Sequence, residues 1–384
     1  MGIRQIIRKP GLAGIWQIIC RGGPVCPPFQ NILSRFDIHW FMASMATGAT
    51  GIFSYLIGQY LQFIFLDYLA VEFILLAFFI FMLCSVFFLL RLLFFYREVI
   101  HDIHDSMLSV FFPAISISAS ILSTAISNVM FPLGLFSFDP HLGYLLALIF
   151  YGFGMASGMG FLLIISYGFS VSQTIEITQA NGAWLLPPVG LFVNIFAGNF
   201  LIAHFPGFIG HSLLIFHVFA LGIAFFSYFL MLSLLFHQLY CCPPPLREMA
   251  PALAVPLAPP GVSVIALLSL EKALDHFPQL ASLQNNLSPF IHVYVPFVIG
   301  YGCFWAILAT LIMARYVKEK NIPFTLGFWA FVFPVAAFGI AIFLTAQNPL
   351  FSFLNGVAIF LWGTSLLLWS FTTYKNLLHL LPRN

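Results

Sequence analysis

Residues 73–90 read FILLAFFIFMLCSVFFLL, an apolar run without a single charged residue. A run of this length and composition can cross the hydrocarbon core of a bilayer as a helix. The rest of the chain has the same character, because 61% of its 384 residues are hydrophobic and only 7% are charged. A soluble domain carries about 25% charged residues. The composition therefore excludes an ordinary soluble enzyme and predicts an integral membrane protein.

Ten apolar segments follow the first 37 residues, and each is long enough to span a membrane. Prolines interrupt the seventh segment, so a plain count of apolar windows gives nine spans as the alternative. With ten spans, we predict an all-α integral membrane fold. The segments are 38–62, 71–95, 108–129, 142–167, 182–203, 208–237, 250–270, 291–315, 325–346 and 351–373.

The cations favour ten spans over nine. With ten, 13 of the 14 Lys and Arg residues fall on one side of the membrane, and only Lys272 falls on the other. Loops rich in Lys and Arg stay in the cytoplasm, which places both termini there. We expect a protein of the plasma (inner) membrane. Its parts are a basic cytoplasmic tail over 1–37, a ten-helix domain over 38–373 and a cytoplasmic tail over 374–384.

No charged residue lies in the middle of a predicted span, where it would cost about 2.5–3.5 kcal/mol. This pattern argues against a relay of buried carboxylates. The six cysteines show neither metal-ligand spacing nor a disulfide framework. His101 and His104, with Asp102 and Asp105, are too few for a membrane metalloenzyme, so we expect them to form a polar cap that opens the third span. We predict no catalytic residue, metal site, cofactor or nucleic-acid partner.

The odd-numbered spans differ from the even-numbered ones. The even spans are rich in Leu and Phe on every side and are expected to face lipid. The odd spans carry small or weakly polar residues at helical spacing, and four of the five contain prolines that are expected to kink them. Such stripes serve close helix packing in many membrane proteins, which is one interpretation. Their strict alternation favours the other, an inner ring of five helices around a pore. The predicted lining is Ser44, Thr47, Gly48, Ser116, Ser120, Ser123, Pro187, Asn194, Pro256, Pro260, Ser263, Pro334 and Ala337.

Three stretches resemble one known family. Residues 102–105 (DIHD) and 111–118 (FFPAISIS) resemble the entry to the third span of the tellurite-resistance/dicarboxylate transporter family. Residues 328–334 (FWAFVFP) resemble its ninth-span motif, and residues 256–263 (PLAPPGVS) its Gly/Pro-rich seventh span. The family includes bacterial tellurite-resistance anion channels, plant slow anion channels and the yeast malate permease. The resemblance covers roughly residues 36–373.

The resemblance implies ten transmembrane helices arranged as five helical hairpins around a central pore, with quasi-fivefold symmetry. It also implies a homotrimer, and a Phe of the ninth span that plugs the pore. By motif position this gate is Phe333. The first span departs from the family, because Ala46 precedes Thr47-Gly48 and no Pro is present. The channel and transporter branches therefore both stay open.

Two classes of function follow. The first is passage of small anions or C4-dicarboxylates through a Phe-gated pore, with chloride, nitrate, sulfite or a malate-like dicarboxylate as substrate. The lining has hydroxyls but no cation, which favours small or weakly held anions. The second is an integral-membrane enzyme or scaffold that uses the bundle as an anchor. No nucleophile–base pair or phosphate-binding loop supports the second class.

Overall fold

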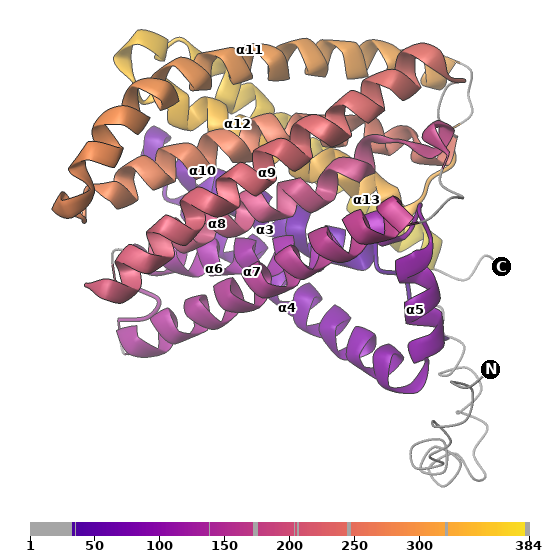
Figure 1. Ribbon diagram of the computed structural model, residues 1–384, viewed down its shortest axis with the longest axis horizontal. Helices are drawn as coiled ribbons and strands as arrows, with labels where there is room; N and C mark the ends of the chain where they lie inside the picture. The colour runs from indigo at the N-terminus through magenta and orange to yellow at the C-terminus, as the bar shows by residue number, and fades with distance from the viewer. Residues whose placement is uncertain are drawn as a thin grey trace, which may run out of the picture.

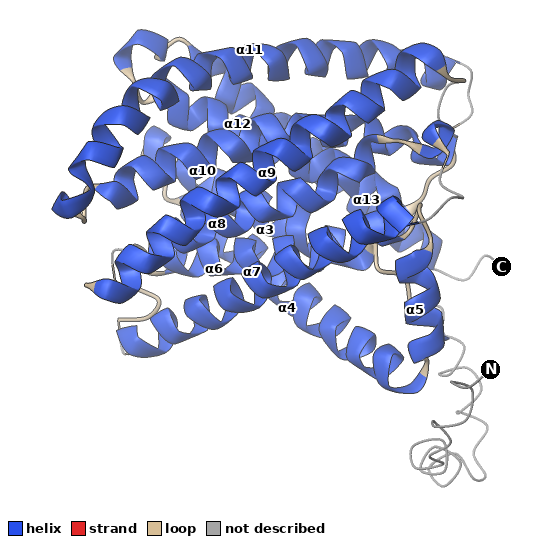
Figure 2. Ribbon diagram, viewed as in Figure 1, coloured by secondary structure: helices blue, strands red, loops and turns tan. Residues whose placement is uncertain are grey.

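A computed structural model of the chain describes residues 33–34, 36–137, 139–171, 176–202, 204–205, 207–243, 247–318 and 322–380. Residues 1–32 and Arg35, which make up nearly all of the predicted basic tail, lie outside the described residues, as do Lys320 and Arg383. The described part is helical and contains no strand (Figure 2). Ten helices are long and apolar enough to cross a membrane, which confirms the predicted number.

The helices follow one another with short connections (Figure 1). Several spans begin or end with a short 3₁₀ or π turn, and these turns carry the label η. The elements are α3 Trp40–Leu61, α4 Phe65–Phe94, α5 Tyr96–His104, η1 Ser109–Phe111, α6 Pro113–Ala125, η2 Ile126–Met130, α7 Pro140–Val171, η3 Ile177–Gln179, η4 Gly182–Leu185, α8 Leu186–Ile202, α9 Phe208–Cys241, η5 Arg247–Leu257, α10 Ala258–Leu274, η6 Pro278–Leu280, α11 Ala281–Lys318, η7 Leu326–Phe328, α12 Trp329–Ala346, η8 Pro349–Phe351 and α13 Leu354–Leu380.

The even-numbered spans extend beyond the predicted boundaries. The second begins at Phe65 rather than at residue 71, because Asp67 lies on its first turn and lowers the local hydropathy. The last helix continues through most of the predicted tail, to Leu380. The long outer helices therefore include polar end turns that an apolar count leaves out.

The odd-numbered spans are inside and the even-numbered spans outside. In the most apolar stretch of each odd span at least 72% of the residues are buried, against at most 39% in each even span. Each odd helix packs against the even helix that follows it, which makes five hairpins along the chain. The inner helices also contact one another in the closed order α3, α6, α8, α10, α12 and back to α3. These contacts are those that a ring of five hairpins requires. The quasi-fivefold pore itself stays a prediction.

The prolines mark helix starts rather than the mid-span kinks that the sequence predicts. Pro113 is the first residue of α6, and Pro187 lies in the first turn of α8. Pro256 lies in η5, just before α10 begins at Ala258. The first turn of a helix has no intrahelical acceptor for its N–H groups, so proline fits there at no cost in hydrogen bonds. Among the described inner helices Pro334 alone lies inside an α-helix, in α12.

Two indole groups join the last hairpin to the first. Trp369 of α13 donates its Nε1–H to the hydroxyl of Thr47 at 2.9 Å. Seven residues earlier in α13, Trp362 donates its Nε1–H to the hydroxyl of Ser54 at 3.0 Å. Both hydroxyls are buried and donate in turn to carbonyls of their own helix, α3. The two bonds satisfy polar groups that lipid could not, and they close the circle of hairpins.

We expect Thr47→Val to lower the free energy of unfolding by about 1–3 kcal/mol, because it keeps the shape but leaves the Trp369 N–H without an acceptor. Thr50→Val is the matched control, since the buried Thr50 hydroxyl bonds only to the carbonyl of Ala46 in its own helix. Unfolding by SDS titration in mixed micelles, followed by circular dichroism, measures both. Equal losses in the two variants would show that the indole bond contributes nothing.

Candidate functional site: the axis of the inner helices

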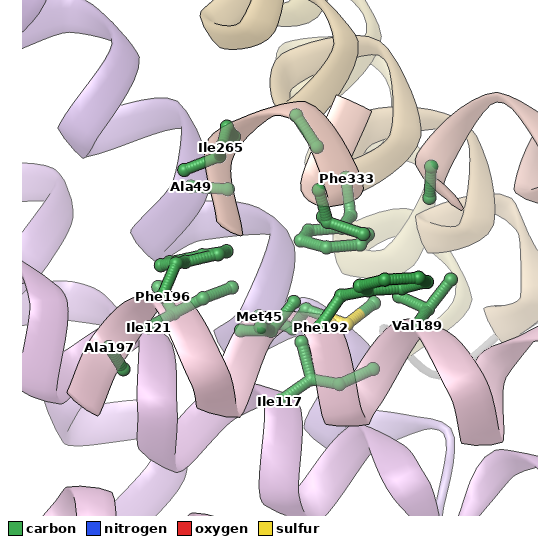
Figure 3. Packing of buried hydrophobic residues seen from close by; sticks show 14 of the residues in the cluster. Met45, Ala49, Ile117, Ile121, Val189, Phe192, Phe196, Ala197, Ile265 and Phe333 are labelled. Atoms are coloured by element: carbon green, nitrogen blue, oxygen red, sulfur yellow. The ribbon is translucent and has the colours of Figure 1, made fainter. Parts of the chain in front are cut away.

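Apolar side chains from all five inner helices meet at the centre of the bundle. Figure 3 shows them gathered in one place, with Phe333 of α12 among them. Phe333 is buried, with 2% of its surface exposed. The labelled members are Met45, Ala49, Ile117, Ile121, Val189, Phe192, Phe196, Ala197, Ile265 and Phe333. We call this group the axial cluster. Its side chains offer no hydrogen bond to an ion or to water.

A close approach of two helices sets the position of α12, which carries Phe333. A methyl group added at Gly261 of α10 would meet backbone atoms of Ala337 and Phe338 at 2.7–2.8 Å. On the outer side, the ring of Phe338 lies where a side chain at Gly302 of α11 would be. Backbone atoms cannot move aside as the end of a flexible side chain can. Only glycine at position 261 therefore allows α10 and α12 to pack this closely. Phe333 lies about one turn before this contact and faces the axial cluster (Figure 3).

A small vestibule lies at the end where the inner helices begin. Its volume is about 190 Å³, and it is lined by the starts of the first, third, seventh and ninth spans. Asp37 and His39 line it from the first span, Glu248 from η5 and Ala330 from α12. Ala330 precedes Phe333 by three residues, about one helical turn, so the vestibule leads toward the axial cluster. The mouth of the axis is thus polar and its centre is apolar.

The carboxylate of Asp37 is held by its neighbour. Its Oδ1 accepts hydrogen bonds from the backbone N–H of His39 at 3.0 Å and from the ring Nδ1 at 2.5 Å. Burial raises the pKa of Asp37, but these bonds and the charge of His39 outweigh it and lower the pKa below the ordinary value. Asp37 therefore stays ionised at neutral pH and gives the vestibule a fixed negative charge.

All five inner helices begin on the same side. Successive spans alternate in direction, and the inner ones are the odd-numbered spans, so their N-terminal ends share one face of the bundle. Each helix N-terminus acts as roughly half a positive charge within its first turn. These five N-terminal ends place partial positive charge around the axis on the face that holds the vestibule.

The predicted lining residues of the first and third spans contact neighbouring helices. Ser44 donates to the carbonyl of Ala77 in α4 at 2.8 Å, and Gly48 allows the close approach of Ile121. Ser123 donates to the carbonyl of Ala147 in α7 at 2.7 Å. Ser116 bonds to the carbonyl of Pro113 in its own helix. Thr47, described above, faces α13. These hydroxyl protons are engaged, and a role at the pore stays a prediction for these residues.

Asn194 joins three helices on the side of α8 that faces α6 and α7. Its Oδ1 accepts from Ser120 of α6 at 2.6 Å, and its Nδ2 donates to the carbonyl of Gly154 in α7 at 2.9 Å. Glycine at 154 and at 158 leaves room for these two side chains, since an added methyl would meet them at 2.2 Å. The structure thus brings together the predicted residues Ser120 and Asn194, at a junction of helices.

The remaining predicted residues lie in α8, η5, α10 and α12. Ser263 bonds to the carbonyl of Pro260 and to the hydroxyl of Tyr294 in the outer helix α11. Ala337 lies in the contact with Gly261. Pro187, Pro256 and Pro334 are buried within the elements given above. Their lining role also stays a prediction, while their contacts agree with the packing interpretation.

Sequence reasoning missed a buried hydrogen-bond chain. The hydroxyl of Tyr151 in α7 lies 2.8 Å from Nε2 of His217 in α9. Nδ1 of His217 lies 2.7 Å from Oδ1 of Asn199 in α8. The Asn199 amide nitrogen donates to Ser269 of α10 at 3.0 Å. Since the amide oxygen can only accept, His217 donates from Nδ1 and accepts from the tyrosine at Nε2. Gly198 makes room for both rings. A histidine inside an apolar span was the available signal.

The group around His101 lies beside the start of the third span. Asp105 accepts from the backbone N–H groups of Met107 and Leu108, in the turn before that span. Among the described residues no side chain caps η1 or α6, so the polar cap stays a prediction. Asp102 forms an ion pair with Arg91 at 2.8 Å, and His104 bonds to a carbonyl of its own helix. His101 is largely exposed. These side chains anchor α5 against α4.

Comparison with known proteins places these features in a wider group. The profile of a protein family described as voltage-dependent anion channel matches residues 35–377. An uncharacterized transporter of Methanocaldococcus jannaschii is 28% identical over 363 residues, covering 91% of this chain and 95% of the relative. A second uncharacterized transporter of that organism is 26% identical over 355 residues, covering 91% and 96%.

We expect Gly261→Ala to lower the free energy of unfolding by about 1–3 kcal/mol, because the new methyl meets backbone that cannot shift without moving α12. The matched control is Gly300→Ala in the outer helix α11, where nothing lies within 4 Å. There alanine replaces a flexible residue in a helix, so stability should stay equal or rise. SDS titration of both variants checks that the free energy of unfolding falls in Gly261→Ala and does not fall in Gly300→Ala. A stable Gly261→Ala protein would refute the close approach.

Proposed function

Because the chain belongs to the voltage-dependent anion channel family, we propose that it carries small anions along the axis of the inner helices, with Phe333 as the gate. Family membership supports anion transport in general. The observation that carries the finer proposal is the axial cluster, to which each of the five inner helices contributes apolar side chains around Phe333. The pathway runs from the vestibule past Ala330 to this cluster.

The proposed gate works by excluding water. An ion that reaches the axial cluster loses its hydration shell and gains no hydrogen bond in return, so a closed apolar constriction stops it. Phe333 supplies the largest part of that barrier in α12, where Pro334 has no N–H to donate to the carbonyl of Ala330 four residues before it. Rotation of one ring opens more space than any change of a small side chain. This proposal places the apolar face of the inner helices along the pathway, and the lining by small polar residues that the sequence predicts is the alternative.

The pathway favours monovalent anions. The attraction of the helix N-termini and the repulsion of Asp37 and Glu248 both scale with the charge of the ion. The cost of dehydration at the axial cluster rises faster than the charge, so a dicarboxylate or other dianion meets a higher barrier than chloride or nitrate. We therefore place small monovalent anions ahead of malate-like dicarboxylates among the candidate substrates.

The remaining parts of the proposal concern the cell and the assembly. The cation distribution supports a plasma (inner) membrane protein with both termini in the cytoplasm. The vestibule then opens to the cytoplasm. The resemblance to known members supports a homotrimer with a pathway in each protomer. Relatives described as transporters give no support to the alternative of an enzyme or scaffold.

We expect Phe333→Ala to raise anion flux at least tenfold, because it removes a phenylalanine ring from the axial cluster that closes the proposed pathway. Phe331→Ala is the matched control, since this half-exposed ring of the same helix packs on Phe328 outside the axial cluster. Flux is measured with purified protein in liposomes by an anion-sensitive dye. Phe333→Leu, which keeps more of the core packing, should give an intermediate flux. Wild-type flux in both Phe333 variants, with normal folding, would refute the gate.

We expect chloride and nitrate to permeate faster than malate in the Phe333→Ala protein. Glu248→Gln in that background should raise malate flux relative to chloride by about two- to fivefold, since the exposed carboxylate contributes a modest, screened repulsion. Glu176→Gln, on the same side but outside the vestibule, is the control. Reversal potentials under opposed gradients give the ratios. Malate passing faster than chloride would contradict the charge argument.

A further inference from the structure

A second and larger cavity lies away from the axis, between the first and last hairpins. Its volume is about 860 Å³, within the range of sites that hold small molecules. The outer helices α4 and α13 form its walls, and Ala43 and Thr47 of the inner helix α3 form its floor. Leu83 of α4 and Leu377 of α13 line it and are exposed on the outer surface of the bundle. We call this cavity the lateral crevice.

The length of the lateral crevice matches one leaflet of a bilayer. Along α4 it runs from Leu76 to Phe87, which is about 16 Å at 1.5 Å per residue. The hydrocarbon core of a bilayer is about 30 Å thick, so this is about half of it. Along α13 it runs toward the end of the helix, from Trp369 to Leu377, on the side where the inner helices begin. The crevice therefore spans the leaflet on the vestibule side.

The two ends of the lateral crevice differ in chemistry. The end toward the membrane centre is lined mainly by apolar side chains of α4. The outer end holds Asn376 and Thr373 of α13 and the carboxylate of Asp37. Asn376 has 93% of its surface buried, and its Nδ2 has no hydrogen-bond partner among the described residues. Oγ1 of Thr373 has none either. Nε1 of the neighbouring Trp329 is unpaired in the same way. Three buried donors at one end of an apolar cavity lack an acceptor.

The charge of the residues that line the lateral crevice narrows the class of molecule that fits it. Asp37 is the one formally charged residue among those that line the crevice. Its Oδ1 is taken by His39, and its side chain is 44% exposed. An anionic head group would face this carboxylate, which His39 and Arg91 hold in its ionised form. A zwitterionic head group places its ammonium there and turns its phosphate and ester oxygens toward the donors of α13.

We propose that the lateral crevice is a binding site for one zwitterionic phospholipid of the ethanolamine class. An acyl chain lies along Leu76, Ile80 and Leu83 of α4, and the head group lies between Asp37 and Asn376. The lipid oxygens supply the acceptor that Asn376 and Thr373 lack, because the terminal torsions of these side chains turn without moving the backbone. The open flank between Leu83 and Leu377 lets the lipid enter from the bilayer.

The site also touches the start of α12. Asp37 and Leu326 line both the lateral crevice and the vestibule. Trp329 lines the crevice and precedes Phe333 by four residues, about one turn of the same helix. A lipid in the crevice therefore fixes the end of the helix that carries the axial phenylalanine. Binding itself does not depend on the proposed transport, so failure of one proposal leaves the other standing.

The test is retention of lipid by the full-length protein. Protein purified in mild detergent is incubated with phosphatidylethanolamine or phosphatidylglycerol and analysed by native mass spectrometry. We expect one phosphatidylethanolamine per chain to survive detergent exchange, with about fivefold weaker retention of phosphatidylglycerol. Leu83→Trp, which fills the crevice, should remove the bound lipid. Val86→Trp is the matched control, because this exposed residue of α4 lies outside the lining.

A second pair of variants tests the head-group contacts. Asp37→Asn should abolish the preference between the two lipids while leaving one lipid bound. Asn376→Leu should weaken both equally. Equal retention by Leu83→Trp and Val86→Trp would overturn the proposal, since the lipid would then lie elsewhere. Preference for phosphatidylglycerol in the wild-type protein would overturn the head-group assignment. Loss of lipid together with a new oligomer across α4 and α13 would show that a second copy, not lipid, covers the crevice.

Discussion

The hydrocarbon core of a bilayer offers no hydrogen-bond partner, so polar groups that the inner helices bring to that depth have to find partners inside the protein. Ser44, Ser120, Ser123 and Asn194 meet this constraint by bonding to carbonyls or side chains of adjacent helices, while others such as Thr50 and Ser116 bond within their own helix. The bonds between helices need a close approach, and small residues on the facing helix allow it, as Gly154 does for Ser120. The hairpins are thus held together by short polar contacts between inner and outer helices. The axis is left to the residues on the remaining face, which are apolar.

This division explains how an anion pathway works in a chain with so few charges. In the proposed pathway the centre is sealed by side chains that do not solvate ions, and Phe333 is the bulkiest contribution of α12 to that seal. In the same proposal, attraction for anions comes from the five helix starts on one face rather than from a cation on the axis. The cost of dehydration at the seal then acts against highly charged anions. The barrier and the attraction come from different parts of the same five helices.

The sequence predicts the ten spans and their division into inner and outer helices well, because the hydropathy of all ten and the stripes of small residues in the odd spans are consequences of burial. It does not reveal which face of an inner helix points to the axis. A stripe of small residues has the same spacing whether it faces a pore or a neighbouring helix, and Ser44 and Met45 are separated by only 100° of rotation. Gly154 and Gly158 of the outer helix α7 were the missing signal. A helix face of small residues opposite a second such face indicates that the two helices pack closely.

Phe333 could be singled out only by its motif, because 48 phenylalanines share its chemistry. The central claim is that the face carrying Met45 and Ile117, and not the face carrying Ser123, lines the conducting path. The most direct measurement is the block of flux by a small anionic methanethiosulfonate reagent in the Phe333→Ala background. We predict rapid block for Ile117→Cys and none for Ser123→Cys, whose side chain faces Ala147 of α7. The reverse pattern would contradict the account and return the lining to the small polar stripe.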